Sequence, residues 1–525
     1  MALFLAWAPA AAAQADTAAV TPDSARVTSR AEELRDLTVF HPDFVTIYPA
    51  SPLLPPGHWA VRAAERLEAA GLAPSYLPAQ GAVPRAAAMA ALLEAGSAVF
   101  SVSAHPRRDG WGALLEGWLE RFVEEFPEYG PAIDPPLLLG AEVGAGYAET
   151  TGVLSPAVGY FAARQDPRPV ADRAGAFGRA AGGVMLGTFA VAAGEVAFFD
   201  GEVEAPRWEV AAGARGWQLS AGRAEVRYGP GRFGGVSLSP RAPLPRVELQ
   251  RTRPLRLPGF LRHAGLVSGH LFVTRMTDEE RHPTEPWMFG ARLAVRPHGR
   301  LTLAINRAAI FGGEGRPLTA RNLAGLAIGV IRSDFENQIL SFDARWRLPT
   351  ETLLPATVYV EWGADDGAGA LNEQPGWVAG LALPALPGVP EVAAGVEAAR
   401  FAGCCGHGAW YFNATFPGNW ARGDQGLGHP LGGEGWERAA YASADLLRGR
   451  LRLDGRFYQR ERTQRSLVEV GGGNLFSPGR TGRSDGGEVA AALRMGRAEA
   501  RAAWAREAGA GWREQALTAA LSAFF

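Results

Sequence analysis

Apolar and charged residues alternate along most of the chain after residue 137. The segment 450–458 is typical. As a strand it would place Leu451, Leu453 and Phe457 on one face and Arg450, Arg452, Asp454 and Arg456 on the other. The same separation recurs in 340–347, 358–362 and 488–495. Because a charge facing lipid costs roughly 2 to 4 kcal/mol at the bilayer midplane, the charged face must point away from lipid. The pattern predicts a mainly β protein with a large transmembrane antiparallel β-barrel over 137–525.

A soluble β-sandwich is the alternative, since it also buries one face and wets the other. It explains less well a whole face of arginines and acids. It also explains poorly the last segment, where Leu517, Leu521 and the final Phe525 share a face opposite Thr518 and Ser522. That ending resembles the insertion signal of outer-membrane β-barrels, and it favours the cell outer membrane, with its lipid as a partner.

A different period precedes the strands and predicts a small helical bundle. Apolar residues follow helical spacing from Trp59 to Gly71, from Pro84 to Ala95, and from Trp111 to Phe126. Gly71 and Gly96 are expected to end the first two helices. Three amphipathic helices can bury their apolar stripes together, so residues 45–131 are predicted to form a helical periplasmic domain.

The first residues indicate export. Ala2 to Ala13 is a short apolar stretch, and Ala13-Gln14-Ala15 offers a cleavage site of the A-x-A kind. We expect a signal peptide over 1–15 and a linker over 16–44. A positively charged start is missing, so a plain Ala-rich tail is the alternative.

One part of the helical region resembles a single S-layer homology repeat. The matching residues are His58-Trp59-Ala60, Glu65-Arg66-Leu67, Ala70-Gly71-Leu72, Arg85 and Leu92-Leu93. The resemblance implies binding of peptidoglycan or another wall polymer, usually through three copies. Only one copy is visible here, and Val83-Pro84-Arg85-Ala86-Ala87 lacks the family's acidic residue. A structural helical pair packed under the barrel is therefore the other interpretation.

Composition narrows the function. The formal net charge of −2 gives no indication of nucleic-acid binding. Cys404 and Cys405 are adjacent, which excludes a framework of long-range disulfides, and we expect a loop feature there. No cofactor or metal site is predicted. No G-x-S-x-G, H-E-x-x-H or phosphate-binding loop occurs, and no histidine pairs evidently with a serine, so no catalytic residue is proposed and an enzyme is not expected.

A second resemblance covers about residues 137 to 525. It rests on Arg227-Tyr228-Gly229-Pro230-Gly231-Arg232-Phe233-Gly234-Gly235, on Arg300 to Arg307 running into Ile310-Phe311-Gly312-Gly313, and on Gly428-His429-Pro430-Leu431-Gly432. These segments resemble the Wzi-type capsule assembly family, with Tyr228 where that family usually has Trp. The resemblance implies an outer-membrane barrel of roughly 18 strands. It also implies a non-catalytic role in binding capsular or extracellular polysaccharide at the cell surface.

Aromatic and charged residues in two segments are the candidate polysaccharide contacts, because sugars bind to aromatic faces and to the forked donors of arginine. The candidates are Arg227, Tyr228, Arg232, Trp410, Tyr411, Trp420, Arg422 and Asp424. Each has a structural alternative. Aromatic residues in barrels often anchor the wall at the membrane interfaces. The glycines around Tyr228 suit a tight turn that enters or covers the lumen. The rival function is a porin-like channel for small solutes, which an open lumen would favour.

Overall fold

The computed structural model describes residues 49–100, 110–129, 137–151, 173–187, 189–199, 202–240, 243–277, 283–328, 334–350, 354–365, 375–402, 410–411, 413, 416, 420–422, 425–463, 469–470, 473–474 and 482–524. The predicted signal peptide (1–15) and linker (16–44) lie outside these residues. So do Cys404, Cys405, Asp424 and Phe525.

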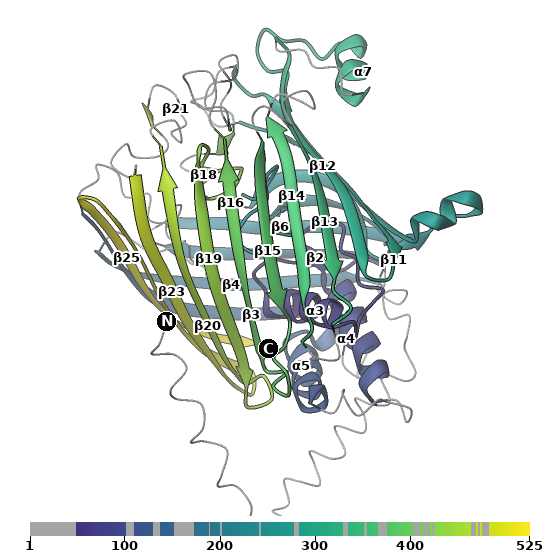
Figure 1. Ribbon diagram of the computed structural model, residues 1–525, viewed down its shortest axis with the longest axis vertical. Coiled ribbons are helices and arrows are strands. Elements are labelled where there is room, and N and C mark those ends of the chain that lie inside the picture. Colours follow the sequence, from purple (N-terminus) through teal and green to yellow (C-terminus); the bar gives the residue numbers. More distant parts are fainter. Residues whose placement is uncertain are drawn as a thin grey trace, which may run out of the picture.

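The described strands of the main sheet form a closed barrel (Figure 1). They are β3 (Leu137–Thr151), β4 (Arg173–Leu186), β5 (Ala190–Phe199), β6 (Glu202–Ala214), β7 (Trp217–Ala224), β8 (Leu244–Arg251), β9 (Leu255–Arg256), β10 (Leu266–Arg275), β11 (Trp287–His298), β12 (Leu301–Phe311), β13 (Glu336–Arg347), β14 (Thr357–Asp365), β15 (Gly376–Leu383), β16 (Val392–Phe401), β19 (Gly435–Leu446), β20 (Leu451–Arg462), β23 (Gly482–Met495), β24 (Ala498–Gly509) and β25 (Trp512–Phe524). Strands β8 and β9 both pair with β10 and act as one interrupted strand, so the wall has 18 strands over the described residues. The predicted barrel is confirmed.

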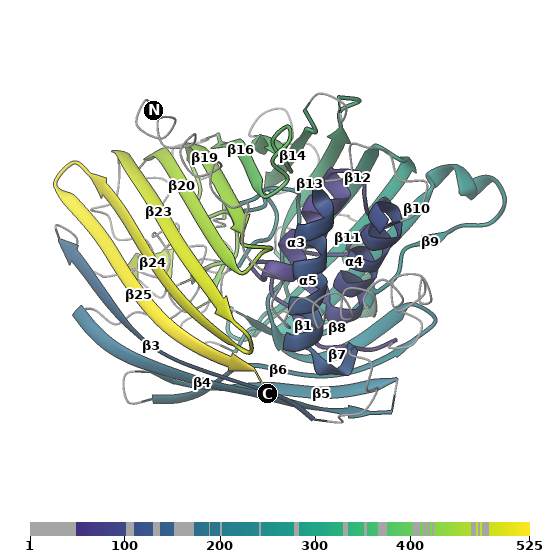
Figure 2. The ribbon, with the colours of Figure 1, turned by 90° about the horizontal axis from the view of Figure 1, so that it is seen from below.

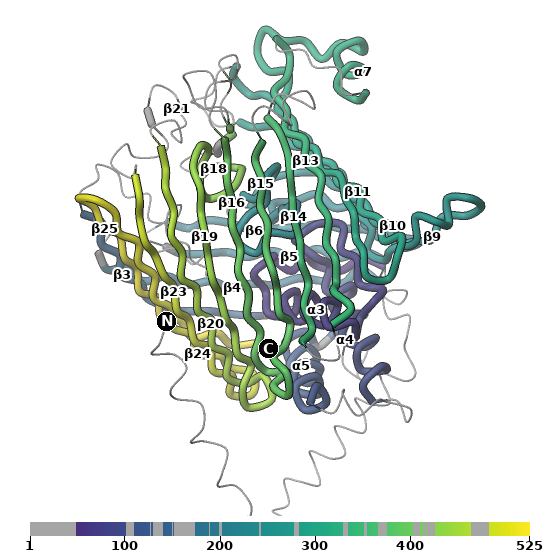
Figure 3. The backbone as a smooth tube through the Cα atoms, in the orientation of Figure 1, coloured from purple at the N-terminus to yellow at the C-terminus, as the bar shows by residue number. Residues whose placement is uncertain are grey.

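Each strand pairs antiparallel with its neighbour, and the ring closes between its last and first strands. Ala519 of β25 lies opposite Ala145 of β3 in that pairing. The strands run at a steep tilt, so those at the front and back of the barrel cross in projection (Figure 3). Tilt of this kind is what closes a sheet into a barrel.

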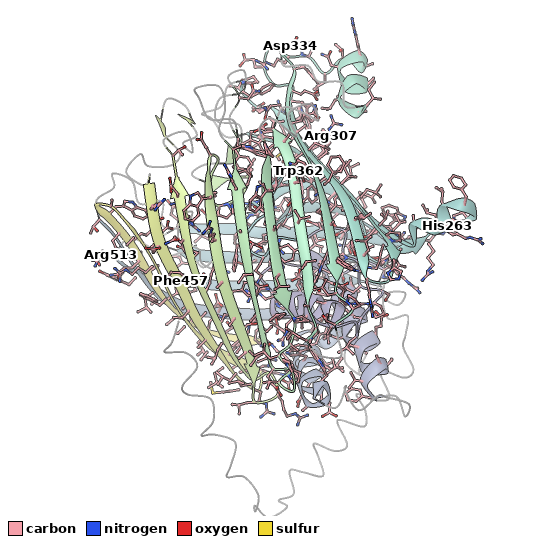
Figure 4. All side chains as sticks on the ribbon, in the orientation of Figure 1. His263, Arg307, Asp334, Trp362, Phe457 and Arg513 are labelled. Carbon is pink, nitrogen blue, oxygen red and sulfur yellow. The ribbon has the colours of Figure 1, made fainter. Side chains whose placement is uncertain are left out.

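Alternation along the strands separates the outer wall from the lumen as the sequence predicts. On β20, Leu453 and Phe457 are 40% and 60% exposed, while Arg452 and Arg456 are buried. Trp362 of β14 and Phe457 lie on the outside of the wall, where their side chains point away from the barrel (Figure 4). The charged face therefore lines the interior, where it meets water and other protein groups rather than lipid.

The N-terminal helices pack on one another through a shared apolar core. They are α3 (Trp59–Ala69), α4 (Arg85–Phe100) and α5 (Trp111–Glu125), followed by a 3-10 turn, η2 (Pro127–Tyr129). The short strands β1 (Leu53–Leu54) and β2 (Val83–Pro84) pair beside them. The expected end of the second helix at Gly96 is wrong, since α4 continues to Phe100. A glycine inside a helix costs only about 1 kcal/mol, and the extra turn buries Val99.

The helices lie within the outline of the strand ring when the barrel is viewed from below (Figure 2). Their charged side chains reach lumenal residues of distant strands. Arg62 Nη1 lies 3.2 Å from Asp454 Oδ1 of β20, and Glu68 lies 2.9 Å from Arg296 of β11 and 3.1 Å from Arg345 of β13. The helical segment is thus held inside one end of the barrel by contacts with its inner face.

Smaller elements lie in the connections. They are β17 (Ala421–Arg422), β18 (Gln425–Gly426), β21 (Glu469–Val470), β22 (Gly473–Asn474), η3 (Gly259–Ala264) and α7 (Ala320–Ile328). Across the described ranges, none of the helices combines the length and the apolar character needed to span a bilayer.

Candidate functional site

The segment between β7 and β8 folds into the barrel lumen. Val226, Tyr228, Val236 and Leu238 are all fully buried there. They pack against lumenal side chains of the wall such as Phe272, in one apolar cluster. The apolar residues around the Tyr228 motif therefore form a second core inside the barrel, which agrees with the structural interpretation of that motif.

Two glutamates of the wall hold the backbone of this segment. Glu361 of β14 accepts hydrogen bonds from the backbone N–H groups of Val236, at 2.9 Å, and Ser237, at 3.4 Å. Glu397 of β16 accepts from the N–H groups of Arg232 and of Phe233, the latter at 3.2 Å. Adjacent backbone N–H groups that converge on one carboxylate form an anion-binding turn. Here the wall itself supplies the anion.

Glycine is required where the segment approaches Glu361. Gly229 has a φ of +84°, and a Cβ atom placed on it would lie 1.9 Å from Glu361 Oε2. A side chain at this position would be strained and would also displace the carboxylate from its partners. The glycine-rich composition of the motif thus follows from its close approach to the wall.

Tyr228 reaches another part of the wall, strands β8 and β10. Its hydroxyl oxygen lies 2.8 Å from His270 Nδ1, and His270 Nε2 lies 3.0 Å from Glu248 Oε2. Arg246 Nε donates to the same carboxylate at 2.6 Å. All four groups are buried, and buried polar groups of this kind are stable only when they are hydrogen-bonded. This chain of contacts fixes Tyr228 as a structural anchor.

The aromatic candidates of the later segment are also buried. Trp410 and Trp420 are each 1% exposed, and both belong to the lumenal cluster. Tyr411 donates its O–H to the backbone oxygen of Val236 at 2.6 Å, and Trp420 Nε1 donates to Asn337. These rings join the two inward segments to each other and leave no open face in this structure. Their role as sugar contacts stays a prediction.

The remaining candidates do not all lie at one site. Arg422 belongs to β17, which pairs with β18, and Asp424 lies outside the described residues. Arg227 and Arg232 line a cavity between the inward segment and α3. The cavity has a volume of about 150 Å³ and is partly open to solvent. The structure thus brings Arg227 and Arg232 together and sets them apart from the aromatic group.

Further cavity residues come from elements that no motif marked. Arg62 and Arg66 come from α3, while Tyr359, Tyr441 and Arg345 come from strands β14, β19 and β13. Alternation identified Arg345 as inward-facing, but nothing local to the sequence indicated that it shares a cavity with a helix. Over the part of the chain that the structure describes, no group of three or more His, Cys, Asp or Glu residues could hold a metal ion.

Comparison with known proteins shows what the chain is similar to. The family model described as capsule assembly protein Wzi matches residues 209–504, which is more than half of the chain. None of the curated proteins matches.

Among solved structures, the Escherichia coli protein Wzi superposes with a TM-score of 0.64. It is 12% identical in sequence, and the alignment covers 90% of this chain and 100% of that chain. That protein is described as an outer-membrane protein involved in group 1 capsule assembly and as a carbohydrate-binding β-barrel. At this identity the likeness shows the fold.

Two Pseudomonas aeruginosa proteins are less similar. OpdL has a TM-score of 0.46 at 8% identity, covering 75% of this chain and 99% of that chain. OpdQ has a TM-score of 0.43 at 10% identity, covering 74% and 98%. Scores this low support no argument about function.

The fold is that of an outer-membrane β-barrel, as the sequence predicts. The matching family consists of assembly proteins rather than enzymes, in line with the lack of catalytic motifs. The chain belongs to the Wzi family of capsule assembly proteins.

Proposed function

We propose that this chain binds capsular or extracellular polysaccharide and retains it at the outer surface of the outer membrane. The observation that carries the proposal is membership of the Wzi family, whose Escherichia coli member is described as a carbohydrate-binding barrel. The chemistry of the lumen is compatible with sugar, since it offers arginine donors and tyrosine rings around a cavity.

The contents of the lumen favour this role over a channel for small solutes. Two connecting segments meet there through the hydrogen bond from Tyr411 to Val236, and a packed apolar cluster surrounds them. The helices close one end through ion pairs with the wall. An apolar plug and buried ion pairs oppose the passage of hydrated solutes, because entry would expose apolar surface and separate the charges.

The proposal predicts a defect in attachment of polymer rather than in its synthesis. Cells lacking this protein should release polysaccharide into the medium while total polymer stays constant. The two fractions can be measured as uronic acid or total sugar in cell pellets and supernatants. Reintroducing the wild-type gene should restore retention. Unchanged retention in the deleted strain, together with clear ion conductance of the purified barrel in planar bilayers, would favour the channel instead.

The S-layer homology resemblance suggests a second role for the helices, binding of peptidoglycan or another wall polymer. We infer that closing the barrel is their main role. Charged residues of the resembling segment are engaged with the wall, since Arg66 pairs with Asp445 and Glu68 pairs with Arg296 and Arg345. The full-length protein should therefore not sediment with purified peptidoglycan beyond the level of an unrelated outer-membrane barrel. Specific, saturable sedimentation would restore the wall-binding interpretation, and with it the division into a 45–131 binding domain and a 137–525 barrel.

A further inference from the structure

The cavity between α3 and the inward segment contains more positive than negative side chains. Its lining includes a set of arginines from the helix, the inward segment and the wall: Arg62, Arg66, Arg227, Arg232, Arg292, Arg296, Arg345 and Arg452. The carboxylates within 4.0 Å of these guanidinium groups, among the described residues, are Glu65, Glu68, Asp343, Asp445 and Asp454. Among the residues that line the cavity, these eight arginines face only three carboxylates, Glu65, Asp343 and Asp445.

This surplus cannot be removed by loss of protons from arginine. A guanidinium group stays protonated in proteins at neutral pH. Burial lowers the pKa of Arg62 to about 9, and the charges of Arg452 and Arg232 act in the same direction. Arg62 therefore still carries its charge under physiological conditions. An unbalanced cation in a partly buried site is costly unless an anion or water compensates it.

Arg232 is the arginine with the least compensation. Its side chain is partly buried, and no carboxylate of the described residues lies within ion-pair distance of its guanidinium group. Its backbone N–H is bound by Glu397, so the residue is held in place by its main chain while its side chain remains available. Among the described residues, the Arg227 guanidinium beside it makes only long polar contacts, at 3.8 Å to Glu65 and 3.4 Å to the backbone oxygen of Arg232.

Aromatic surface lies next to this free donor. The guanidinium carbon of Arg232 is 5.4 Å from the centre of the Tyr441 ring, and Tyr359 also lines the cavity. Tyr359 is fixed by its O–H, which donates to Glu397 at 2.7 Å. The guanidinium lies over the Tyr441 ring, which holds the fork in place. The acidic group of a sugar can then accept two N–H bonds from Arg232 while the sugar ring packs beside the tyrosine. A free inorganic anion would use the cation and leave the ring unused.

We propose that this cavity binds the carboxylate or phosphate group of an acidic saccharide, with Arg232 as its principal donor and Tyr441 beside the sugar ring. This deepens the proposed function, on which it rests, because it names an acidic sugar as the recognised class. It also locates recognition in the lumen, apart from the buried aromatic residues of the 410–420 segment.

Calorimetry on the purified full-length protein in detergent tests the site directly. Glucuronate should bind, glucose should bind at least about tenfold more weakly, and the affinity for glucuronate should fall as salt is raised. Arg232→Gln should weaken glucuronate binding by about tenfold or more. Arg483→Gln is the matched control, since its side chain is 78% exposed on another part of the barrel. It should leave the affinity unchanged.

Several outcomes would overturn the proposal. Equal affinity for glucuronate and glucose would remove the role of the acid, and unchanged affinity in Arg232→Gln would remove the role of this residue. Inorganic phosphate that binds as tightly as glucuronate would show a general anion site instead of a saccharide site. Heat-modifiable migration on gels shows whether the variant barrel is folded. Tyr441→Leu gives an independent variant, which should weaken glucuronate but not phosphate.

An experiment in cells distinguishes failure of this inference from failure of the proposed function. With Arg232→Gln in the chromosome, the proposal predicts partial release of an acidic polymer from the surface. Full retention by that variant, in a strain where deletion of the gene does release polymer, would overturn the inference and leave the proposed function intact. Retention that survives deletion of the gene would overturn the proposed function itself.

Discussion

His58 makes two structural contacts at the N-terminal end of α3. His58 caps α3, because its Nδ1 accepts the backbone N–H of Ala60 at 3.2 Å. Its Nε2 lies 2.9 Å from Glu125 Oε1 and donates to that carboxylate. The neutral ring satisfies both contacts, whereas a second proton on Nδ1 would remove the cap. Burial lowers the pKa of His58, in agreement with this geometry.

The helical end of the barrel should therefore weaken in acid. An unfolded histidine titrates near 6.5, so the contribution of His58 is complete above that pH and is lost as the pH falls toward the lower folded value. Although burial opposes it, the hydrogen bond from His58 and the charge of Arg121 hold the pKa of Glu125 below its ordinary value, which adds a further loss in stronger acid. The protection factor of the Ala60 amide, which corrects for the slower intrinsic exchange in acid, should fall between about pH 7 and pH 5.

Replacing the ring by an amide tests this assignment. His58→Asn keeps a capping oxygen that does not titrate in this range. The fall in protection should then disappear, while the exchange rate at neutral pH stays close to that of the wild type. If the variant retains the full acid response, another group is responsible.

At the scale of elements, the helices depend on the wall as much as on one another. Glu68 near the end of α3 joins Arg296 of β11 to Arg345 of β13, and its side chain is 8% exposed. Removal of the carboxylate would leave the buried Arg296 and the partly buried Arg345 without their shared partner. Breaking a buried ion pair in this way costs about 3 kcal/mol or more.

Glu68→Gln should consequently loosen the helices without destroying the barrel. Limited proteolysis should release the helical segment faster, at a rate that reflects about 3 kcal/mol lost with the two ion pairs of Glu68. Glu116→Gln is the control, because Glu116 pairs with an Arg448 side chain that is 38% exposed. That change should cost less than about 1 kcal/mol. Equal release rates for the two variants would show that the helices are held by their apolar contacts instead.

Across the whole molecule, one rule separates the outer wall from the lumen: charges face inward. The rule has a measurable energetic consequence at Phe457, which is 60% exposed on the outer wall of β20. Phe457→Arg should reduce the free energy of unfolding in lipid vesicles by roughly 2 to 4 kcal/mol, because the charge would face the hydrocarbon. Leu447→Arg, at a 65% exposed position in the turn before β20, should be close to neutral. Similar losses for both would contradict the assignment of Phe457 to the lipid-facing wall.

The same rule explains how much the sequence could predict. Alternation on β20 is enforced by the cost of placing charge in lipid, so it survives as a local pattern and predicted the wall. Helical spacing likewise predicted α3 and α5. The lumenal contents could not be predicted in this way, because Glu361 meets Val236 across 125 positions of sequence and Tyr411 meets it across 175. Local periodicity contains no information on such pairs, and the aromatic residues at 410–420 give the same pattern whether they face sugar or each other.

The order of segments along the chain constrains how the protein can be assembled. Helices α3 to α5 precede the first wall strand, yet inside the ring they contact late strands, as in the pairing of Arg121 with Glu499 of β24. The ring closes where β25 meets β3, so its seam is made by the last strand to be delivered. A sealed cylinder offers no lateral entrance. The helices must therefore reach these contacts either before β25 pairs with β3 or through one end of the closed ring, and a mutation that speeds closure would leave only the second route.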